Sequence, residues 1–247
     1  MRAPDTLARA SDAAFHAADT AVNPEAKDEL LHQAQTLAAH SALADAYAYL
    51  QKAVGLIAVT LPFVVAIGNP LTGGHGMEGS ISAYCYTHMG NYFVGALFAL
   101  GVFFLSYNYR PLPNYRIDNY LSTVASVMAV GVALLPTASD TGSASGGAKT
   151  VAVLHLVCAG VLFVLLAVFS LFLFTKTDAG ALVSPAKRRR NAVYRVCGVI
   201  IVVCLAAVVG AEIAKVHVLF WLESIMVVAF GISWLVKGGF LNLLADR

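Results

Sequence analysis

The chain has 247 residues, of which 59% are hydrophobic and 12% are charged. Soluble domains carry about 25% charged residues, so this composition excludes an ordinary soluble protein and indicates a membrane protein. Residues 1–50 carry seven acidic and three basic side chains, whereas residues 51–247 carry seven acidic and thirteen basic ones. We therefore predict two parts, a cytoplasmic acidic helical arm at 1–50 and a transmembrane domain at 51–247.

The arm is rich in alanine and lacks the basic start and compact apolar core of a signal peptide. Asn23 and Pro24 predict the start of a helix, with Asn23 as its cap and Pro24 in its first position. Apolar residues between Leu30 and Leu50 approximate one helical face. We expect this amphipathic face, within residues 24–50, to pack on its own bundle, on a second copy of the chain or on a cytoplasmic protein partner.

The rest of the chain contains six apolar stretches, each close to the length of about 20 residues that crosses a bilayer. Each must be helical, because lipid offers unpaired backbone groups no partner. The predicted fold is thus all-α, an integral membrane bundle of six transmembrane helices that follows the helical arm. The predicted spans are 52–68, 91–107, 120–136, 150–174, 192–211 and 216–236.

The loop between the first two spans, residues 71–90, is long, and loops of this length are usually functional or disordered. Its segment from Ser80 to His88 alternates polar and aromatic residues. This alternation favours an ordered segment on the outer surface, which we interpret as the lid or wall of a site.

The basic residues of the loops predict the orientation, because short loops rich in Lys and Arg stay on the cytoplasmic side. Lys149 and Lys215 fall on one side of the predicted spans. All the other lysines and arginines after residue 50 fall on the opposite side. We therefore predict a plasma or inner membrane protein with both termini cytoplasmic. The residues on the basic side are Lys52, Arg110, Arg116, Lys176, Lys187, Arg188, Arg189, Arg190, Arg195, Lys237 and Arg247.

Two ionisable residues, His155 and Glu223, lie inside predicted spans, where such groups are costly and usually face the bundle interior. Counted from the outer starts of their spans, both lie about 10 Å below the outer surface. This shared depth predicts that they can meet, and that they either form a site or tie the fourth and sixth spans together. Around this level we select nine ligand-binding candidates: Glu78, Ser80, Ser82, Tyr84, His88, Asn119, His155, Trp221 and Glu223.

The sequence has few of the residues that a metal or organic cofactor would need. Zinc needs three or four converging ligands, and no short-range ligand motif is present. Haem needs histidines from pairs of helices, and retinal needs a lysine in mid-span, whereas only His155 lies well inside a span and Lys215 and Lys237 lie at span ends. We predict no metal, no cofactor and no nucleic acid partner.

From about residue 75 onward the chain resembles bacterial six-span membrane proteins of unknown function and, more distantly, the damage-regulated autophagy modulators. The segment from Ser80 to Tyr86, the pair Asn119 and Ser122, His155, and Trp221 with Glu223 carry this resemblance. The chain is also similar to membrane ceramidase-type hydrolases in placing Ser, His and carboxylate residues near one face. It differs from them because it has neither a His-x-x-x-His pair nor a seventh span, which argues against a zinc amidase.

Three functions are compatible with these features. The first is an outward-facing polar site between the third, fourth and sixth spans that binds a membrane lipid headgroup or small amphiphile. The second is a membrane-embedded lipid hydrolase or transferase, in which Glu223 orients His155 as the base and Ser80 or Ser82 is the nucleophile. The third is a structural subunit of a membrane complex. Binding is favoured, because no nucleophile is visibly paired with a base.

Overall fold

The structure is a computed structural model that describes residues 3–106, 116–137, 146–177 and 183–240. Every regular element in these ranges is a helix, which confirms the all-α prediction. Arg110 and Arg247 of the predicted basic side lie outside them. The elements are α1 (Ala3–Thr20), α2 (Pro24–Leu71), η1 (Ser82–Tyr86), α3 (Gly90–Ser106), α4 (Arg116–Leu134), α5 (Gly146–Val168), the π-helical η3 (Phe169–Leu173), α6 (Pro185–Ala214) and α7 (Leu219–Lys237).

Five of the described helices are long and apolar enough to cross a membrane: α2, α4, α5 with η3, α6 and α7. The predicted second span corresponds to α3, which is apolar but has 17 described residues. Those residues rise about 25 Å, less than the hydrocarbon thickness of about 30 Å. The chain therefore has the helices of a membrane protein, and the count of six spans stays a prediction.

Helix α2 begins where the sequence predicts, because the Asn23 side chain accepts a hydrogen bond of 3.0 Å from the backbone N–H of Glu25. The helix then runs for 48 residues, through Pro62 and up to Leu71. At 1.5 Å per residue it is about 72 Å long, more than twice the thickness of a hydrocarbon core. The predicted boundary near residue 50 is therefore not a break in the backbone, since one helix belongs to both the arm and the bundle.

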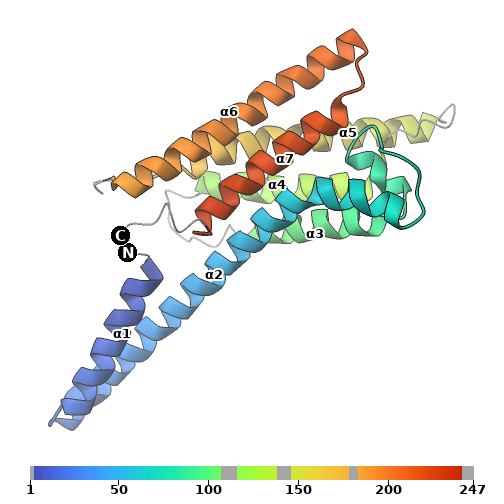
Figure 1. Cartoon of the computed structure of the whole chain (residues 1–247). Coiled ribbons are helices and arrows are strands. Elements are labelled where there is room, and N and C mark those ends of the chain that lie inside the picture. The colour runs from blue at the N-terminus through green and yellow to red at the C-terminus, as the bar shows by residue number, and fades with distance from the viewer. Residues whose placement is uncertain (1–2, 107–115, 138–145, 178–182, 241–247) are drawn as a thin grey trace.

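The sequence predicts a helical arm but no separate helix before Asn23; in the structure α1 is such a helix, and it folds back along the first half of α2 (Figure 1). We call residues 3–50 the hairpin. Ala18 and Ala34 are fully buried, and the Ser11 hydroxyl donates a hydrogen bond of 3.0 Å to the carbonyl oxygen of Ala34. Small side chains let the two helices lie close together, so the arm packs on itself and projects away from the bundle (Figure 1).

The second half of α2 enters the bundle and packs on α7 at a pair of glycines. A Cβ atom added to Gly55 would lie 2.8 Å from the carbonyl oxygen of Gly231, and one added to Gly231 would lie 2.8 Å from that of Gly55. Small residues allow this kind of close approach between helices in lipid. Helices α3 and α4 also pack together.

Replacing Gly231 by alanine is expected to lower the free energy of unfolding by about 1–3 kcal/mol, because the added methyl group forces α2 and α7 apart. Thermal unfolding of the purified protein in detergent measures this effect. Gly210→Ala is the matched control, since nothing lies within 4 Å of a Cβ added there. Equal midpoints for the two variants would contradict the packing described for α2 and α7.

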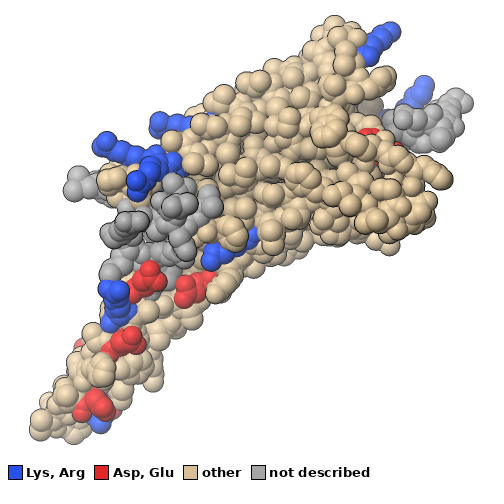
Figure 2. Space-filling model, viewed as in Figure 1, with Lys and Arg blue, Asp and Glu red and all other residues tan. Residues whose placement is uncertain are grey.

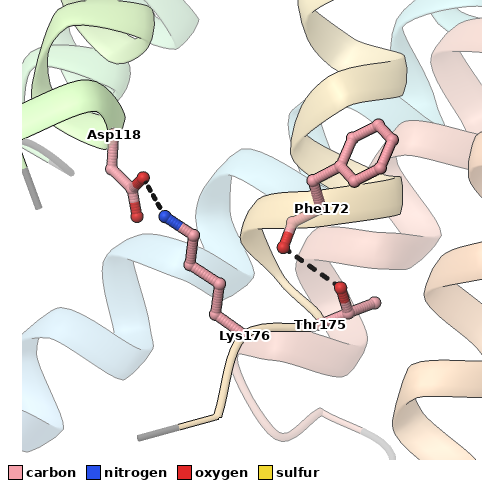
Figure 3. A network of polar contacts seen from close by, with 4 residues as sticks. All are labelled: Asp118, Phe172, Thr175 and Lys176. Atoms are coloured by element: carbon pink, nitrogen blue, oxygen red, sulfur yellow. Dashed lines mark hydrogen bonds and ion pairs between the residues drawn. The ribbon is translucent and has the colours of Figure 1, made fainter. Parts of the chain in front are cut away.

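At the end of the bundle nearest the hairpin, polar side chains form hydrogen bonds and an ion pair around the end of η3. Lys176 forms an ion pair with the buried Asp118 of α4, and the Thr175 hydroxyl donates to the carbonyl oxygen of Phe172 at 3.1 Å (Figure 3). From α6, the Lys187 ammonium donates to the carbonyl oxygen of Phe174 at 3.1 Å. The Thr175 hydroxyl and the Lys187 ammonium satisfy carbonyls that a helix end leaves without partners, and the ion pair joins the residues after η3 to α4.

Charge is divided between the two parts of the molecule as the sequence predicts (Figure 2). Acidic side chains lie along the hairpin. Lysine and arginine side chains gather where α6 begins, at the hairpin end of the bundle, and fewer lie at the far end (Figure 2). Consecutive helices from α2 to α7 run up and down between these two ends (Figure 1).

Candidate ligand-binding site

The far end of the bundle is covered by the segment between α2 and α3, residues 72–89, which we call the cap. It begins with two glycines in the left-handed region, Gly73 at φ 91° and Gly76 at φ 68°, a conformation that glycine adopts without steric cost. The Asn69 side-chain amide donates to the carbonyl oxygen of Gly76 at 3.4 Å. The cap continues into the helical turn η1, which confirms that the segment from Ser80 to His88 is ordered.

The cap is joined to the start of α7 by three contacts. The backbone N–H of Phe220 donates to the carbonyl oxygen of Gly79 at 2.9 Å. The Glu223 carboxylate accepts a hydrogen bond of 2.7 Å from the backbone N–H of Ile81 through Oε2. The rings of Tyr84 and Phe220 pack with their centroids 6.0 Å apart. Helix α7 therefore holds the cap over the bundle.

Two tyrosines of the cap make further contacts. Tyr84 is fully buried, and its hydroxyl accepts a hydrogen bond of 3.4 Å from the backbone N–H of Glu78. Burial raises the pKa of the Tyr84 phenol, so it remains neutral. The Tyr86 hydroxyl donates to the carbonyl oxygen of Thr137 at 2.6 Å and so joins the cap to the segment after α4.

Beneath the cap, a cavity of about 50 Å³ extends between the helices. A single water needs about 10–15 Å³ by this measure, so the cavity is small, with room for only a few waters. Its lining is apolar except for Ser82 and Glu223 at the capped end. Along α7, the lining reaches from Glu223 to Phe230, a rise of about 10 Å. The other lining residues are Ala58, Leu61, Ile81, Phe93, Leu97, Leu100, Phe104, Ala129, Val132, Ala159, Leu162, Phe163, Leu166 and Val227.

The two polar side chains of the cavity keep unused hydrogen-bonding capacity. Glu223 is 8% exposed, and an ionised carboxylate offers about four lone-pair positions. The bond from Ile81 occupies one of them, on Oε2, and within the described ranges Oε1 accepts no hydrogen bond. The Ser82 hydroxyl likewise has no hydrogen-bond partner in the part of the chain that the structure describes. The surface of the cavity is nearly all apolar, so a ligand would reach these two polar side chains only at the capped end, where they belong to the lining.

The predicted contact between His155 and Glu223 is wrong. His155 is buried, but its Nδ1 donates to the carbonyl oxygen of Leu135, 2.6 Å away at the end of α4. No hydrogen bond or ion pair joins the two side chains, both of which the structure describes, and His155 does not line the cavity. Equal depth in the bundle did not determine the direction in which each helix turns its side chain. His155 instead ties α5 to α4.

The other candidates divide between the cap and places outside the cavity. The Ser80 hydroxyl accepts a hydrogen bond of 3.0 Å from the backbone N–H of Ala83 and so supports η1. His88 is exposed on the cap, and Trp221 is 58% exposed on the outside of α7. Asn119 lies in the first turn of α4, at the hairpin end, and cannot belong to a site beneath the cap.

The apolar lining was not predicted, and the sequence carries little signal for it. Ala58, Ala129 and Ala159 come from three different helices and all border the cavity. Alanine leaves space where a larger side chain would fill the interior. Alanine also serves close helix packing in membranes, so its presence does not by itself reveal a cavity.

In the described ranges, no group of three His, Cys, Asp or Glu side chains is arranged to hold a metal ion. The chain was also compared with known proteins. No protein-family model, no curated protein and no solved structure matches it significantly. The resemblance to six-span families therefore stays a prediction, and the cavity and cap carry the functional argument.

Proposed function

We propose that the protein is a six-span integral membrane protein that binds a small amphiphile between its helices. The apolar part of the amphiphile occupies the cavity, and its polar end lies beside Glu223 and Ser82 under the cap. The observation that carries this proposal is the distribution of polarity in the cavity, which is apolar along its length and polar only at the capped end. Binding sites for small molecules commonly combine an apolar lining with a few placed polar groups.

The orientation follows from the positive side chains. The end of the bundle that carries the start of α6 also carries Arg188, Arg189 and Arg195. Under the positive-inside rule this end is cytoplasmic, and so is the hairpin attached to it. The cap then faces outward, in a plasma or inner membrane. An amphiphile enters the site from the outer leaflet or from the outer solution.

Binding is better supported than hydrolysis. Catalysis by the predicted pair needs His155 beside a serine nucleophile, within about 3 Å. His155 uses Nδ1 on the Leu135 carbonyl oxygen, and the Ser80 hydroxyl accepts from Ala83. Ser82 lines the cavity, but among the described residues Glu223 is the only titratable side chain that lines it too. A binding function needs no base, and it uses the groups that meet at the capped end.

Filling the cavity tests the proposal. We expect Ala159→Phe to abolish retention of the amphiphile, because the new ring occupies the space between α5 and the opposite helices. Native mass spectrometry of the protein released from lipid nanodiscs measures the bound mass. Val157→Phe, on the exposed face of the same helix, is the control and should keep the ligand. Equal retention by the two variants, or no ligand on the unchanged protein, would overturn the proposal.

The hairpin supports a second candidate function, that of a structural subunit. Six of its acidic side chains are exposed and form no ion pair within the described ranges: the four aspartates Asp12, Asp19, Asp28 and Asp45, and Glu25 and Glu29. Leu43 and Tyr49 are also exposed, at 68% and 69%. Such a projection can dock a basic cytoplasmic partner or a second copy. If it does, changing the four aspartates to asparagine should shift the native mass of the detergent-extracted complex to that of the free chain. An unchanged mass, or a free chain from the start, would exclude this role.

A further inference from the structure

The polar end of the cavity has acceptors but no positive charge. Among the described residues that line it, Glu223 carries the only ionisable side chain, and no Lys, Arg or His is present. Glu223 also forms no ion pair with any described residue. Buried charges in proteins are normally paired, so an ionised carboxylate here requires a counter-charge that the chain does not supply.

From this arrangement we infer the chemical class of the occupant, in an inference that rests on the proposed function. The geometry points to a single-chain amphiphile with a primary or secondary amine as its polar group. The ammonium donates hydrogen bonds to Glu223 Oε1 and to the Ser82 hydroxyl, which are the two groups left available. Its alkyl chain runs along α7 from Glu223 toward Phe230.

The same arrangement disfavours acidic amphiphiles. A fatty acid or a phosphate monoester would place a second negative charge beside Glu223, and like charges in one site destabilise each other's ionised forms. No cation among the lining residues offsets this repulsion. Two-chain lipids are disfavoured by space, since a cavity of about 50 Å³ is too small to hold two chains.

A chain-matched series separates these possibilities. Decylamine, decanol, decanoic acid and decyltrimethylammonium share an alkyl length and differ in the polar group. Their dissociation constants are measured on the full-length protein in nanodiscs, with Ala159→Phe subtracted as the background for partition into lipid. We expect decylamine to bind about tenfold or more tightly than decanol, because charge-assisted hydrogen bonds contribute about 1.5–3 kcal/mol. Decanoic acid should bind least.

Substitution of the carboxylate tests the assignment to Glu223. Glu223→Gln keeps an oxygen that can accept a hydrogen bond from Ile81 but removes the charge. In this variant the dissociation constants of decylamine and decanol should differ by no more than about threefold, because only a neutral hydrogen bond remains. Ser82→Ala should reduce the preference less and leaves the cap contact of Glu223 in place. Thermal midpoints of both variants, compared with the unchanged protein, establish that the cap is still held.

Each possible result of these binding measurements supports or overturns a different claim. Decylamine preference that depends on Glu223 supports the inference, and so does weaker binding of decyltrimethylammonium, which lacks an N–H donor. Equal binding of amine, alcohol and acid, all abolished by Ala159→Phe, keeps the proposed function and overturns the amine assignment. Amine preference that survives Glu223→Gln overturns the role of Glu223. Failure of every compound to bind above the background overturns the proposed function as well.

Discussion

Phe104→Ala is expected to lower the free energy of unfolding by about 3 kcal/mol, the largest loss of stability among the predicted variants. The ring lies toward the hairpin end of the cavity, with its centroid 5.6 Å from that of Phe169, 5.8 Å from Phe230 and 6.2 Å from Trp234. Truncating a buried Phe in a soluble core costs about 3–5 kcal/mol. We expect the lower end of this range, because unfolded helices in lipid keep apolar surroundings.

Unfolding of the detergent-solubilised protein, followed by circular dichroism, measures this loss. Phe172→Ala is the matched control, because Phe172 is 62% exposed and its removal leaves no interior void. The control should change stability by less than about 0.5 kcal/mol. A Phe104→Ala protein as stable as the control would mean that the aromatic cluster does not hold the bundle together.

Glu223→Ala is expected to release the cap. Without the carboxylate, the buried backbone N–H of Ile81 loses its acceptor, at a cost of about 1.5–3 kcal/mol for a hydrogen bond to a charged group. That cost corresponds to an increase of about tenfold to a hundredfold in the population of the open cap. Hydrogen exchange resolved to the cap peptides measures it, since exchange at Ile81 and the following turn requires opening.

Two variants control this experiment. Glu223→Gln retains an acceptor oxygen and should keep slow exchange in the cap. Glu212→Ala removes an exposed carboxylate at the end of α6 that makes no contact with the cap among the described residues, and it should change nothing there. If exchange in the cap stays slow in Glu223→Ala, the contact with Ile81 does not close the site.

The sequence predicts the elements of this fold better than their arrangement. Local rules predict the start of α2 at Asn23, the helical spans and the ordered segment from Ser80 to His88. These rules are helix-capping chemistry, apolar length and residue alternation. Helix α1 was missed, because its buried surface consists of small side chains such as Ala18 and Ser11 rather than large apolar ones. Small residues bury little apolar area and give a weak periodic signal.

Prediction of the site from the sequence meets the same limit. Depth along a helix follows from counting residues, and that count placed His155 and Glu223 near one level. The direction of each side chain around its helix depends on how neighbouring helices pack, and one sequence does not reveal that packing. The sequence also does not distinguish apolar residues that line the cavity from apolar residues that face outward. Leu97 lines the cavity and Val102 of the same helix is exposed, although both are the apolar residues that any span contains.

The central claim is that the space between the helices, with Glu223 at its capped end, is a binding site. An experimental density map of the protein prepared in native lipid tests it most directly. The account predicts elongated density that extends from Glu223 and Ser82 along α7 to Phe230, with a polar end within hydrogen-bonding distance of the carboxylate. A cavity collapsed by repacked side chains, or a Glu223 side chain turned out toward the lipid, would contradict it.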